Sequence, residues 1–543
     1  MNTHPKRSLS VMARWFAVAA FAALGNVAMA QQPPAENAPP QADPPARVAG
    51  VTALEGSVVF APSGETEWTA LPRNRPITKG DRVWTDDGAR AELHFGSSVL
   101  QMDGRTFVEV VAIDDDVVQL AVNEGSVNAR ARELRAGDNF EITTPQLALR
   151  ATQPGDWRLD VDPQQGTTRA TSYSGVAVLY GAGGNVQQVV PGQQLAFTGR
   201  DLAQVGNVPP AANDGFESWA MDRNRAEDQS VAARYIPRDV VAYPGLDQYG
   251  SWSSDPTYGT VWYPQVAVAD WAPYRYGHWE SIAPWGWTWI DDAPWGFAPF
   301  HYGRWAVIGT RWAWVPGPLG RHPVYAPALV AFVGGGPSIG WYPLAPGEVW
   351  RPYWNASPAY VRNANRYLVA DSRFYNTGTH WFLQHRPDAI TTVRVDDFNH
   401  GRAVNSRWSH MRAADVARAQ PAAPPAPLRE ARREFPREQA RIIQQQGQPL
   451  PQRLAPPPQR EPRQQFVQPR EERRDQRQAQ RQEQRAVQAQ RVEAFRAQRR
   501  ESVQPQRAYA AQQQHSATAQ RREERAVQRQ AQHEERGHGR RYE

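Results

Sequence analysis

The sequence of 543 residues contains no cysteine. This absence excludes disulfide scaffolds, thiolate zinc sites, iron–sulfur clusters, cysteine nucleophiles and an anchor on an acylated cysteine. Lysine is nearly absent as well, because Lys6 and Lys79 are the only lysines among 61 basic residues. Arginine therefore carries almost all of the positive charge, and its guanidinium group binds carboxylate and phosphate in a bidentate way.

The first thirty residues have the three parts of a secretory signal peptide. Basic residues precede an apolar run from Trp15 to Val27, and small residues occupy positions −3 and −1 before Gln31. The apolar run is shorter than the about 20 residues that a membrane-spanning helix needs. We therefore expect cleavage after Ala30, a periplasmic or secreted protein of a Gram-negative bacterium, and no transmembrane helix after the signal peptide.

The net charge of +6 divides unevenly along the chain. Residues 411–543 contain 28 arginines against 16 acidic residues, a net +12, so that residues 1–410 carry −6. This basic region is rich in Arg, Gln, Ala and Pro and poor in apolar residues, a composition that predicts disorder. Its arginines suit anionic envelope polymers or lipid headgroups, and export argues against nucleic acid. The alternative is a solvated charged tail with no partner.

Residues 48–200 alternate between apolar and polar residues in short runs. One run is Thr106-Phe107-Val108-Glu109-Val110-Val111, and turn sequences such as Asp86-Asp87-Gly88 separate the runs. A period of two places the apolar side chains on one face of each strand. Short strands with turn signals at about every 8–12 residues predict an all-β roll, sandwich or barrel.

The same region resembles the FecR-type periplasmic domain, named for the ferric-citrate regulator. The likeness rests on Leu54-x-Gly56-Ser57-Val58, on the run from Lys79 to Leu93, and on Thr106-x-Val108-Glu109-Val110. The family's Arg-Gly-Thr element reads Arg150-Ala151-Thr152 here. The regulator's cytoplasmic anti-sigma segment and membrane helix have no counterpart in the sequence. The resemblance therefore implies the fold, and a periplasmic sensor or regulatory module that acts with a membrane partner is an alternative function.

Fourteen of the 21 tryptophans lie within residues 249–354. A Tyr-Gly-x-Trp motif occurs there three times, at separations of 27 and 26 residues, and a second strand-like piece follows each copy. Such a period indicates repeated supersecondary units, here β-hairpins. Glycine beside each aromatic residue lets a ring lie flat over the neighbouring backbone. The motif residues are Tyr249, Gly250, Trp252, Tyr276, Gly277, Trp279, Tyr302, Gly303 and Trp305.

Two rows of alternating tryptophans allow two interpretations. Trp285, Trp287 and Trp289 form one row. Trp312 and Trp314 form the other, and each row shares one face of a predicted strand. Such rows usually form core packing, because each buried ring removes about 150–250 Å² from water. An exposed row would instead stack on a planar or sugar-like ligand and bind a glycan or protein partner.

The Trp-rich region also resembles a Trp-Gly-rich domain that follows FecR-like domains in many proteobacterial secreted proteins. The likeness rests on the segments Leu246–Trp252, Trp271–Trp279, Trp295–Trp305 and Gly340–Leu344. It extends to about Asn365. That family has no established activity, so the resemblance implies an architecture and no chemistry.

The sequence contains only weak signals of an active site. His278 and His301 each adjoin a Tyr-Gly-x-Trp motif and suit a metal pair, but no third ligand has convincing spacing, and hydrogen bonding among aromatic rings is favoured. Asp156, Asp160 and Asp162 suit glycoside hydrolysis only as a positioned pair about 5–9.5 Å apart. We therefore expect no enzyme, no cofactor and no metal. A polysaccharide- or wall-active enzyme is the less favoured alternative.

The sequence thus predicts a mainly β protein: a FecR-like all-β roll or sandwich, a Trp-rich β-hairpin repeat domain and a disordered tail. We expect an exported, non-enzymatic, envelope-associated binding or scaffolding protein. The expected parts are a signal peptide (1–30), a Pro/Gln-rich linker (31–47), the FecR-like domain (48–200), a connector with a short helix (201–248), the Trp-Gly repeat domain (249–365), a peripheral segment (366–410) and the tail (411–543).

Overall fold

The computed structural model describes residues 43–206, 214–317, 323–335, 337–354, 356–366, 386–411, 413–416 and 420–426, together with positions 522, 525 and 529. The chain divides into two units, residues 1–459 and residues 460–543. Every element below belongs to the first unit. The predicted signal peptide and most of the predicted linker and tail lie outside the described residues. Within the described part of the chain, no helix is long and apolar enough to cross a bilayer.

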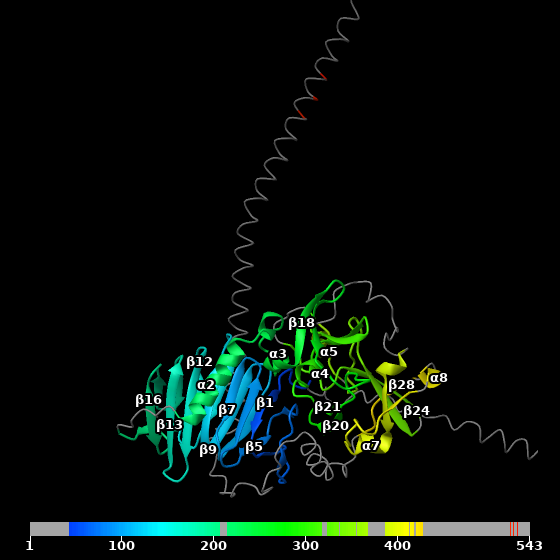
Figure 1. Ribbon diagram of the computed structural model, residues 1–543. Helices are drawn as coiled ribbons and strands as arrows, with labels where there is room; N and C mark the ends of the chain where they lie inside the picture. The colour runs from blue at the N-terminus through cyan, green and yellow to red at the C-terminus, as the bar shows by residue number, and fades with distance from the viewer. Residues whose placement is uncertain are drawn as a thin grey trace, which may run out of the picture. The chain divides into compact units, whose positions relative to one another are not determined.

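Two β-sheets, here named sheet A and sheet B, form the first part of the described chain (Figure 1). Sheet A contains β1 (Ala49–Glu55), β4 (Pro76–Ile77), β6 (Arg90–Phe95), β7 (Ser98–Met102), β12 (Gly155–Asp162), β13 (Thr167–Ser174), β16 (Gln194–Thr198) and β17 (Ala203–Gln204). Sheet B contains β2 (Val58–Ala61), β3 (Thr69–Ala70), β5 (Arg82–Thr85), β8 (Thr106–Ile113), β10 (Asn139–Thr143), β11 (Ala148–Ala151), β14 (Ala177–Tyr180) and β15 (Val186–Val189).

The long strand β9 (Val117–Ala131) belongs to both sheets and joins them. Its first residues pair with β8 and, in parallel, with β10, whereas its last residues pair with β7 and β12. One hydrophobic cluster unites side chains of both sheets, and Leu100 of β7 and Val108 of β8 are fully buried in it. Along β8 buried residues alternate with half-buried ones as far as Val110, where a bulge shifts the register. The predicted mainly β fold is confirmed.

Helix α2 (Gly215–Asp228) lies across sheet A, where Figure 1 shows it in front of β7 and β12. It begins after Asp214, whose carboxylate accepts the backbone N–H of Glu217 at 2.7 Å. Such an N-cap satisfies one of the free donors in the first turn of a helix. Three short helical segments follow: η1 (Ala232–Arg234), η2 (Tyr243–Gly245) and α3 (Leu246–Tyr249).

The Trp-rich region consists of four β-hairpins. They are β18 (Gly250–Asp255) with β19 (Gly259–Pro264), β20 (Gly277–Ile282) with β21 (Gly286–Asp291), β22 (Arg304–Ile308) with β23 (Arg311–Val315), and β24 (Val330–Gly335) with β25 (Ser338–Pro343). The first three are the predicted repeats. The fourth was not predicted, because its first strand lacks the Tyr-Gly-x-Trp motif.

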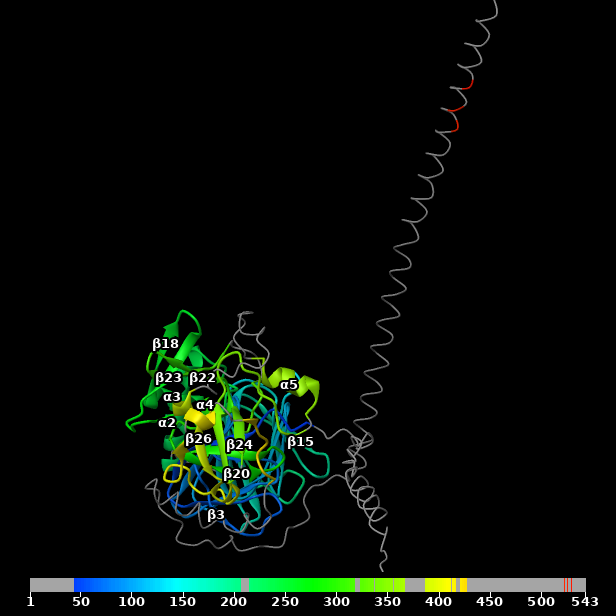
Figure 2. The same ribbon diagram turned by 90° about the vertical axis from the view of Figure 1, so that its right-hand side faces the viewer.

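The remaining elements complete the sheets around these hairpins. β18, β19, β22 and β23 form a four-stranded sheet, and β24 to β28 form a five-stranded one, as Figure 2 shows for β18, β22 and β23 and for β24 and β26. The elements not yet named are α4 (Ala298–His301), α5 (Pro358–Ala364), η3 (Pro387–Ala389), β26 (Thr391–Arg394), α7 (Val395–Asn399), β27 (Ser409–His410), α8 (Ala413–Val416) and β28 (Gln420–Pro421). The segment predicted as peripheral thus contributes two strands, β26 and β27, to a sheet.

Each predicted repeat places two tryptophans directly opposite each other. The opposed pairs are Trp252–Trp262, Trp279–Trp289 and Trp305–Trp314, and Phe332–Trp341 is the corresponding pair of the fourth hairpin. Cross-strand aromatic pairs stabilise a hairpin by roughly 0.2–1 kcal/mol each. The repeat is therefore a hairpin with an aromatic pair at a fixed register.

The motif glycine of each repeat lies under an indole ring of the second strand. A Cβ atom added at Gly277 would lie 2.7 Å from Cζ2 of Trp289 and 2.2 Å from the carbonyl oxygen of Ile290. At Gly250 the added Cβ would lie 2.4 Å from Cε2 of Trp262. These approaches are closer than van der Waals contact, so the predicted reason for glycine in the motif is confirmed.

Replacing Gly277 by alanine should therefore lower the free energy of unfolding by about 1–3 kcal/mol, the usual cost of overpacking. The clash involves backbone atoms of β21, which cannot move aside without disturbing the hairpin. Urea denaturation followed by far-UV circular dichroism measures the change. Gly245→Ala is the control, because its added Cβ would meet no heavy atom closer than 3.9 Å. Equal stability of both variants would contradict the prediction.

Candidate functional site

The tryptophan rows lie in the core of the hairpin region. Trp285, Trp287, Trp289 and Trp314 are each at most 1% exposed, and Trp312 is half-buried. The interpretation of these rows as an exposed stacking platform is therefore wrong. The reason is that neighbouring hairpins and later segments cover both rows and pack them against other aromatic rings, which removes their large apolar area from water.

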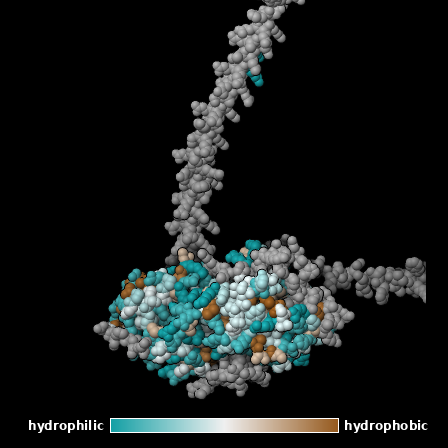
Figure 3. All heavy atoms as spheres, turned by 45° about the horizontal axis from the view of Figure 1, so that its top comes forward, coloured by the Kyte–Doolittle hydropathy of each residue, from teal (hydrophilic) through white to brown (hydrophobic). Residues whose placement is uncertain are grey.

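The exposed apolar side chains of the described residues are scattered on the face that Figure 3 shows. There, hydrophobic residues form small separate groups among hydrophilic ones. Scattered apolar residues are normal for a protein surface, whereas a concave apolar site is the usual seat of a ligand.

A groove of about 260 Å³ opens beside this core, and we name it the aromatic groove. Aromatic side chains of β20, β21, β24 and the segment after β25 line it: Trp279, Trp287, Phe332, Trp350 and Tyr353. Its remaining wall includes part of residues 420–426, which we name the proline strap. The strap has the sequence Gln-Pro-Ala-Ala-Pro-Pro-Ala.

The proline strap is held by a few specific hydrogen bonds. Its first two residues form β28, which pairs with β24. The backbone N–H of Ala422 donates to the carbonyl of Phe332 at 3.0 Å, and the indole N–H of Trp287 donates to the carbonyl of Pro425 at 2.6 Å. The predicted start of the tail at residue 411 is therefore too early, because the open edge of β24 and the indole of Trp287 give these residues binding partners.

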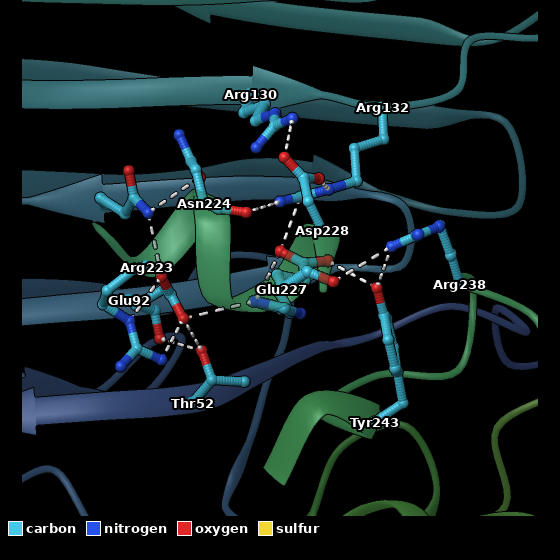
Figure 4. A network of polar contacts seen from close by, with 12 residues as sticks. Thr52, Glu92, Arg130, Arg132, Arg223, Asn224, Glu227, Asp228, Arg238 and Tyr243 are labelled. Atoms are coloured by element: carbon cyan, nitrogen blue, oxygen red, sulfur yellow. Dashed lines mark hydrogen bonds and ion pairs between the residues drawn. The ribbon is translucent and has the colours of Figure 1, made fainter. Parts of the chain in front are cut away.

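A buried network of charged side chains connects α2 to sheet A (Figure 4). Glu92 of β6 accepts two hydrogen bonds from Arg223 of α2, at 2.8 and 2.6 Å. It also accepts from Thr52 at 2.7 Å and from Gln101 at 3.0 Å. Burial alone would raise the pKa of Glu92, but hydrogen bonds from His94 and Arg223 outweigh burial and hold that pKa well below its ordinary value.

The network continues from α2 to η2. Glu227 of α2 forms an ion pair at 2.6 Å with Arg132, the residue directly after β9, and accepts a hydrogen bond from the hydroxyl of Tyr243 at 3.0 Å. Arg238 donates to the same hydroxyl at 2.7 Å. Tyr243 belongs to the hydrophobic cluster of the Trp-rich region. The network therefore binds sheet A, the helix and the start of the hairpins together, which is a structural role.

A second buried contact joins the loop before β4 to β20. Arg75 donates to Glu280 at 3.1 Å and to Asp81 at 3.2 Å, and all three side chains are at most 8% exposed. The side-chain amide of Asn74 donates to the backbone carbonyls of Asp291 and Ala293 at 2.8 and 2.6 Å. We name these contacts the Arg75 junction. Because buried charges need their partners, the junction ties the two hydrophobic cores together.

The three aspartates considered for glycoside hydrolysis have structural partners. Asp160 accepts from Arg158 at 2.9 Å and from Ser126 at 2.7 Å, and Asp162 accepts two backbone N–H groups of the next turn. Asp156 accepts from Asn224 of α2 at 2.9 Å. All three lie along β12, and none lines the aromatic groove.

Asp156 predicts a dependence of stability on pH. Burial raises its pKa to about 6, despite the opposing effect of Arg130. Between pH 4 and 6 the folded chain therefore binds more protons at this site than the unfolded chain, so this site's contribution to stability falls as pH rises through that window. Asp156→Asn should remove the fall and add about 1–2 kcal/mol to the free energy of unfolding at pH 7.

Urea denaturation at pH 4.5 and pH 7 tests this prediction. Asp222→Asn is the control, because Asp222 lies exposed on α2 and pairs with Arg225 within the helix. The control should leave the pH dependence unchanged. A parallel shift of Asp156→Asn at both pH values would contradict the proposed titration.

The two histidines considered as a metal pair, His278 and His301, are buried. Burial lowers the pKa of His278 and of His301 to about 4, so both rings are neutral at pH 7. Among the described residues, no group of three or more His, Asp or Glu side chains is placed to hold a metal ion. The segment Gly336-Pro337-Ser338-Ile339-Gly340 has the spacing of a nucleophile elbow, but Ser338 opens the second strand of a hairpin instead of a strand-to-helix turn.

Comparisons with known proteins give little further guidance. No curated protein matches this sequence significantly. Two crystal structures of a "putative anti-sigma factor" from Parabacteroides distasonis ATCC 8503, at 2.50 and 1.65 Å resolution, each share 12% sequence identity with this chain at a TM-score of 0.20. The matches cover 23% and 34% of this chain and 57% and 86% of the two solved chains. These similarities are too low to assign a fold or a function. Residues 243–348, the hairpin region up to Glu348, match a family described as "Family of unknown function (DUF6600)".

Proposed function

We propose that this chain is an exported, non-enzymatic binding or scaffolding protein of the bacterial envelope, and that its ligand binds at the aromatic groove. The observation that carries the proposal is the groove itself: a concave apolar site with five aromatic side chains on a body whose cores are joined by buried ion pairs. Ligand sites are typically concave, apolar and largely preformed. The FecR-type resemblance of residues 48–200 and the signal peptide pattern agree with an extracytoplasmic role.

The arginine-rich tail gives the proposal a second contact with the envelope. Its 28 arginines would bind phosphate or carboxylate groups of anionic polymers or lipid headgroups. Such binding is electrostatic and weakens as salt screens the charges. Co-sedimentation of the full chain with anionic lipid vesicles should therefore decrease between 50 and 500 mM salt.

Titration of the full chain with soluble peptidoglycan fragments and with lipopolysaccharide tests the groove. A ligand of the groove should change the tryptophan fluorescence, because Trp279 and Trp287 line it. Val349→Phe should abolish the change, since Val349 lines the groove and is 40% exposed, so a larger ring fills the groove without entering the core. Val268→Phe is the matched control at an exposed valine outside the groove. Ligand-induced changes that Val349→Phe leaves intact would contradict the proposed site.

A further inference from the structure

The proline strap fills the aromatic groove only in part. A volume of about 260 Å³ stays open between the strap residues Pro421–Pro424 and the side chains of Trp350 and Tyr353. This volume exceeds the about 150 Å³ of an engineered apolar cavity that binds benzene. Pro421 and Ala423 are themselves exposed. The groove therefore has room for more side-chain volume than the strap supplies.

A second proline-rich segment of the chain packs on the same hairpin region. The strap ends in Ala-Ala-Pro-Pro-Ala, and residues 42–46 read Ala-Asp-Pro-Pro-Ala. Pro44 is buried, and the carbonyl of Ala46 accepts the N–H of Tyr325 at 2.8 Å. The carboxylate of Asp43 accepts the N–H of Ser357 at 2.8 Å. Two Pro-Pro segments far apart in the sequence thus form backbone hydrogen bonds with the hairpin region.

A positively charged side chain at the groove favours an acidic ligand over the uncharged strap. Arg351 lines the groove and is exposed, and in the described part of the chain it has no ion pair or side-chain hydrogen bond. The strap carries no charged side chain. An acidic residue beside a Pro-Pro pair would supply the partner that the strap does not offer to Arg351.

We propose that the aromatic groove recognises an acidic proline-rich segment of a partner protein, and that the proline strap occupies the groove in cis until such a segment displaces it. This inference rests on the proposed function, because it names the ligand of the same groove. Proline-rich segments adopt an extended helix with free carbonyls and lose little entropy on docking against aromatic grooves. The indole N–H of Trp287, which now donates to Pro425, would donate to a carbonyl of the incoming segment.

Fluorescence anisotropy of labelled peptides on the full chain tests the proposal. One probe copies the strap, Gln-Pro-Ala-Ala-Pro-Pro-Ala, and the other replaces its second Ala by Asp. The variant Pro424→Gly/Pro425→Gly removes the two stiff prolines and should raise the fraction of chains in which the groove is open. We expect both peptides to bind this variant about tenfold more tightly than the natural chain, because the natural groove is occupied for most of the time.

Arg351 gives the test for the acidic residue. In the strap variant, Arg351→Gln should weaken the acidic peptide about two- to fivefold and leave the neutral peptide unchanged, as expected for one exposed ion pair. Arg225→Gln is the control, since Arg225 is an exposed arginine of α2 far from the groove residues in sequence. Equal losses for both peptides would overturn the role of Arg351.

Three results would overturn the proposal. The first is the absence of peptide binding to a strap variant with native circular dichroism. The second is a concentration-dependent dimer in sedimentation, which would show that the groove takes the strap of a second copy. The third is binding of peptidoglycan fragments that Val349→Phe abolishes while neither peptide binds. This third result would reject the proline-rich ligand and retain the proposed function.

Discussion

Replacing Trp279 by alanine is expected to lower the free energy of unfolding by about 3–5 kcal/mol, the range for removing a large buried aromatic side chain. Trp279 is 1% exposed and lies where β20, β21, the fourth hairpin and α7 meet. Its ring lies with centroid separations of 5.2–5.5 Å from four other rings, those of Trp289, Phe332, Trp341 and Phe398. Because these rings come from separate elements, none can move alone to fill the cavity.

Urea denaturation followed by far-UV circular dichroism measures this loss. Trp279→Phe should cost clearly less, because a smaller ring keeps part of the contact with all four neighbours. Trp219→Ala is a second control, since Trp219 is a half-buried tryptophan on α2 outside this cluster. A cost below about 1 kcal/mol for Trp279→Ala would show that the aromatic cluster collapses around the gap and is not a rigid core.

The sequence predicts the hairpins well, because the information lies within each repeat. The spacing of the Tyr-Gly-x-Trp motifs predicts the three repeated hairpins, and Trp252, Trp279 and Trp305 each lie opposite a tryptophan of the second strand. The fourth hairpin escaped prediction because Phe332 replaces the motif tryptophan. Its period nevertheless continues, since Phe332 follows Trp305 by 27 residues.

Whether a tryptophan row is exposed could not be read from its own strand. Alternation predicts that Trp285, Trp287 and Trp289 share a side, although Trp285 precedes β21 and Gly286 has a positive φ of 78°. The segments that cover these rings come from other parts of the chain. Trp287 is covered in part by the proline strap, whose Pro425 lies 138 residues further along the chain. From its composition the strap was predicted to belong to the disordered tail. Proline and alanine are typical both of disordered segments and of peptides that bind in grooves, so composition does not separate the two.

The candidate site shows the same limit. The sequence contains the five aromatic residues of the groove, but it does not show that they lie together. They meet only because two hairpins pack against the segment after β25. The Arg75 junction joins residues 205 positions apart, and no local pattern around Arg75 points to Glu280. Contacts between distant elements depend on the whole fold. The sequence therefore predicts the single hairpins but not the contacts that join one element to another.

Replacing Arg75 by methionine is expected to lower the free energy of unfolding by about 3–5 kcal/mol, because it leaves Glu280 and Asp81 buried without this cation. Arg75 also lies over the ring of Phe60, 4.4 Å from its centroid. Methionine retains the apolar contact with Phe60, so the measured loss of stability comes mainly from the removed positive charge. Chemical denaturation at pH 7, with fluorescence and circular dichroism recorded together, measures the change for both cores.

A double-mutant cycle with Glu280→Gln isolates the ion pair across the junction. Arg75→Met/Glu280→Gln should be more stable than Arg75→Met alone, because the second change removes the buried negative charge that the first leaves behind. Arg225→Ala is the matched control: its ion pair with Asp222 has a distance of 2.8 Å, but both side chains are at least 65% exposed. The control should cost at most about 0.5 kcal/mol, because exposed pairs of this kind contribute little. An Arg75→Met variant as stable as Arg225→Ala would show that the junction does not hold the two cores together.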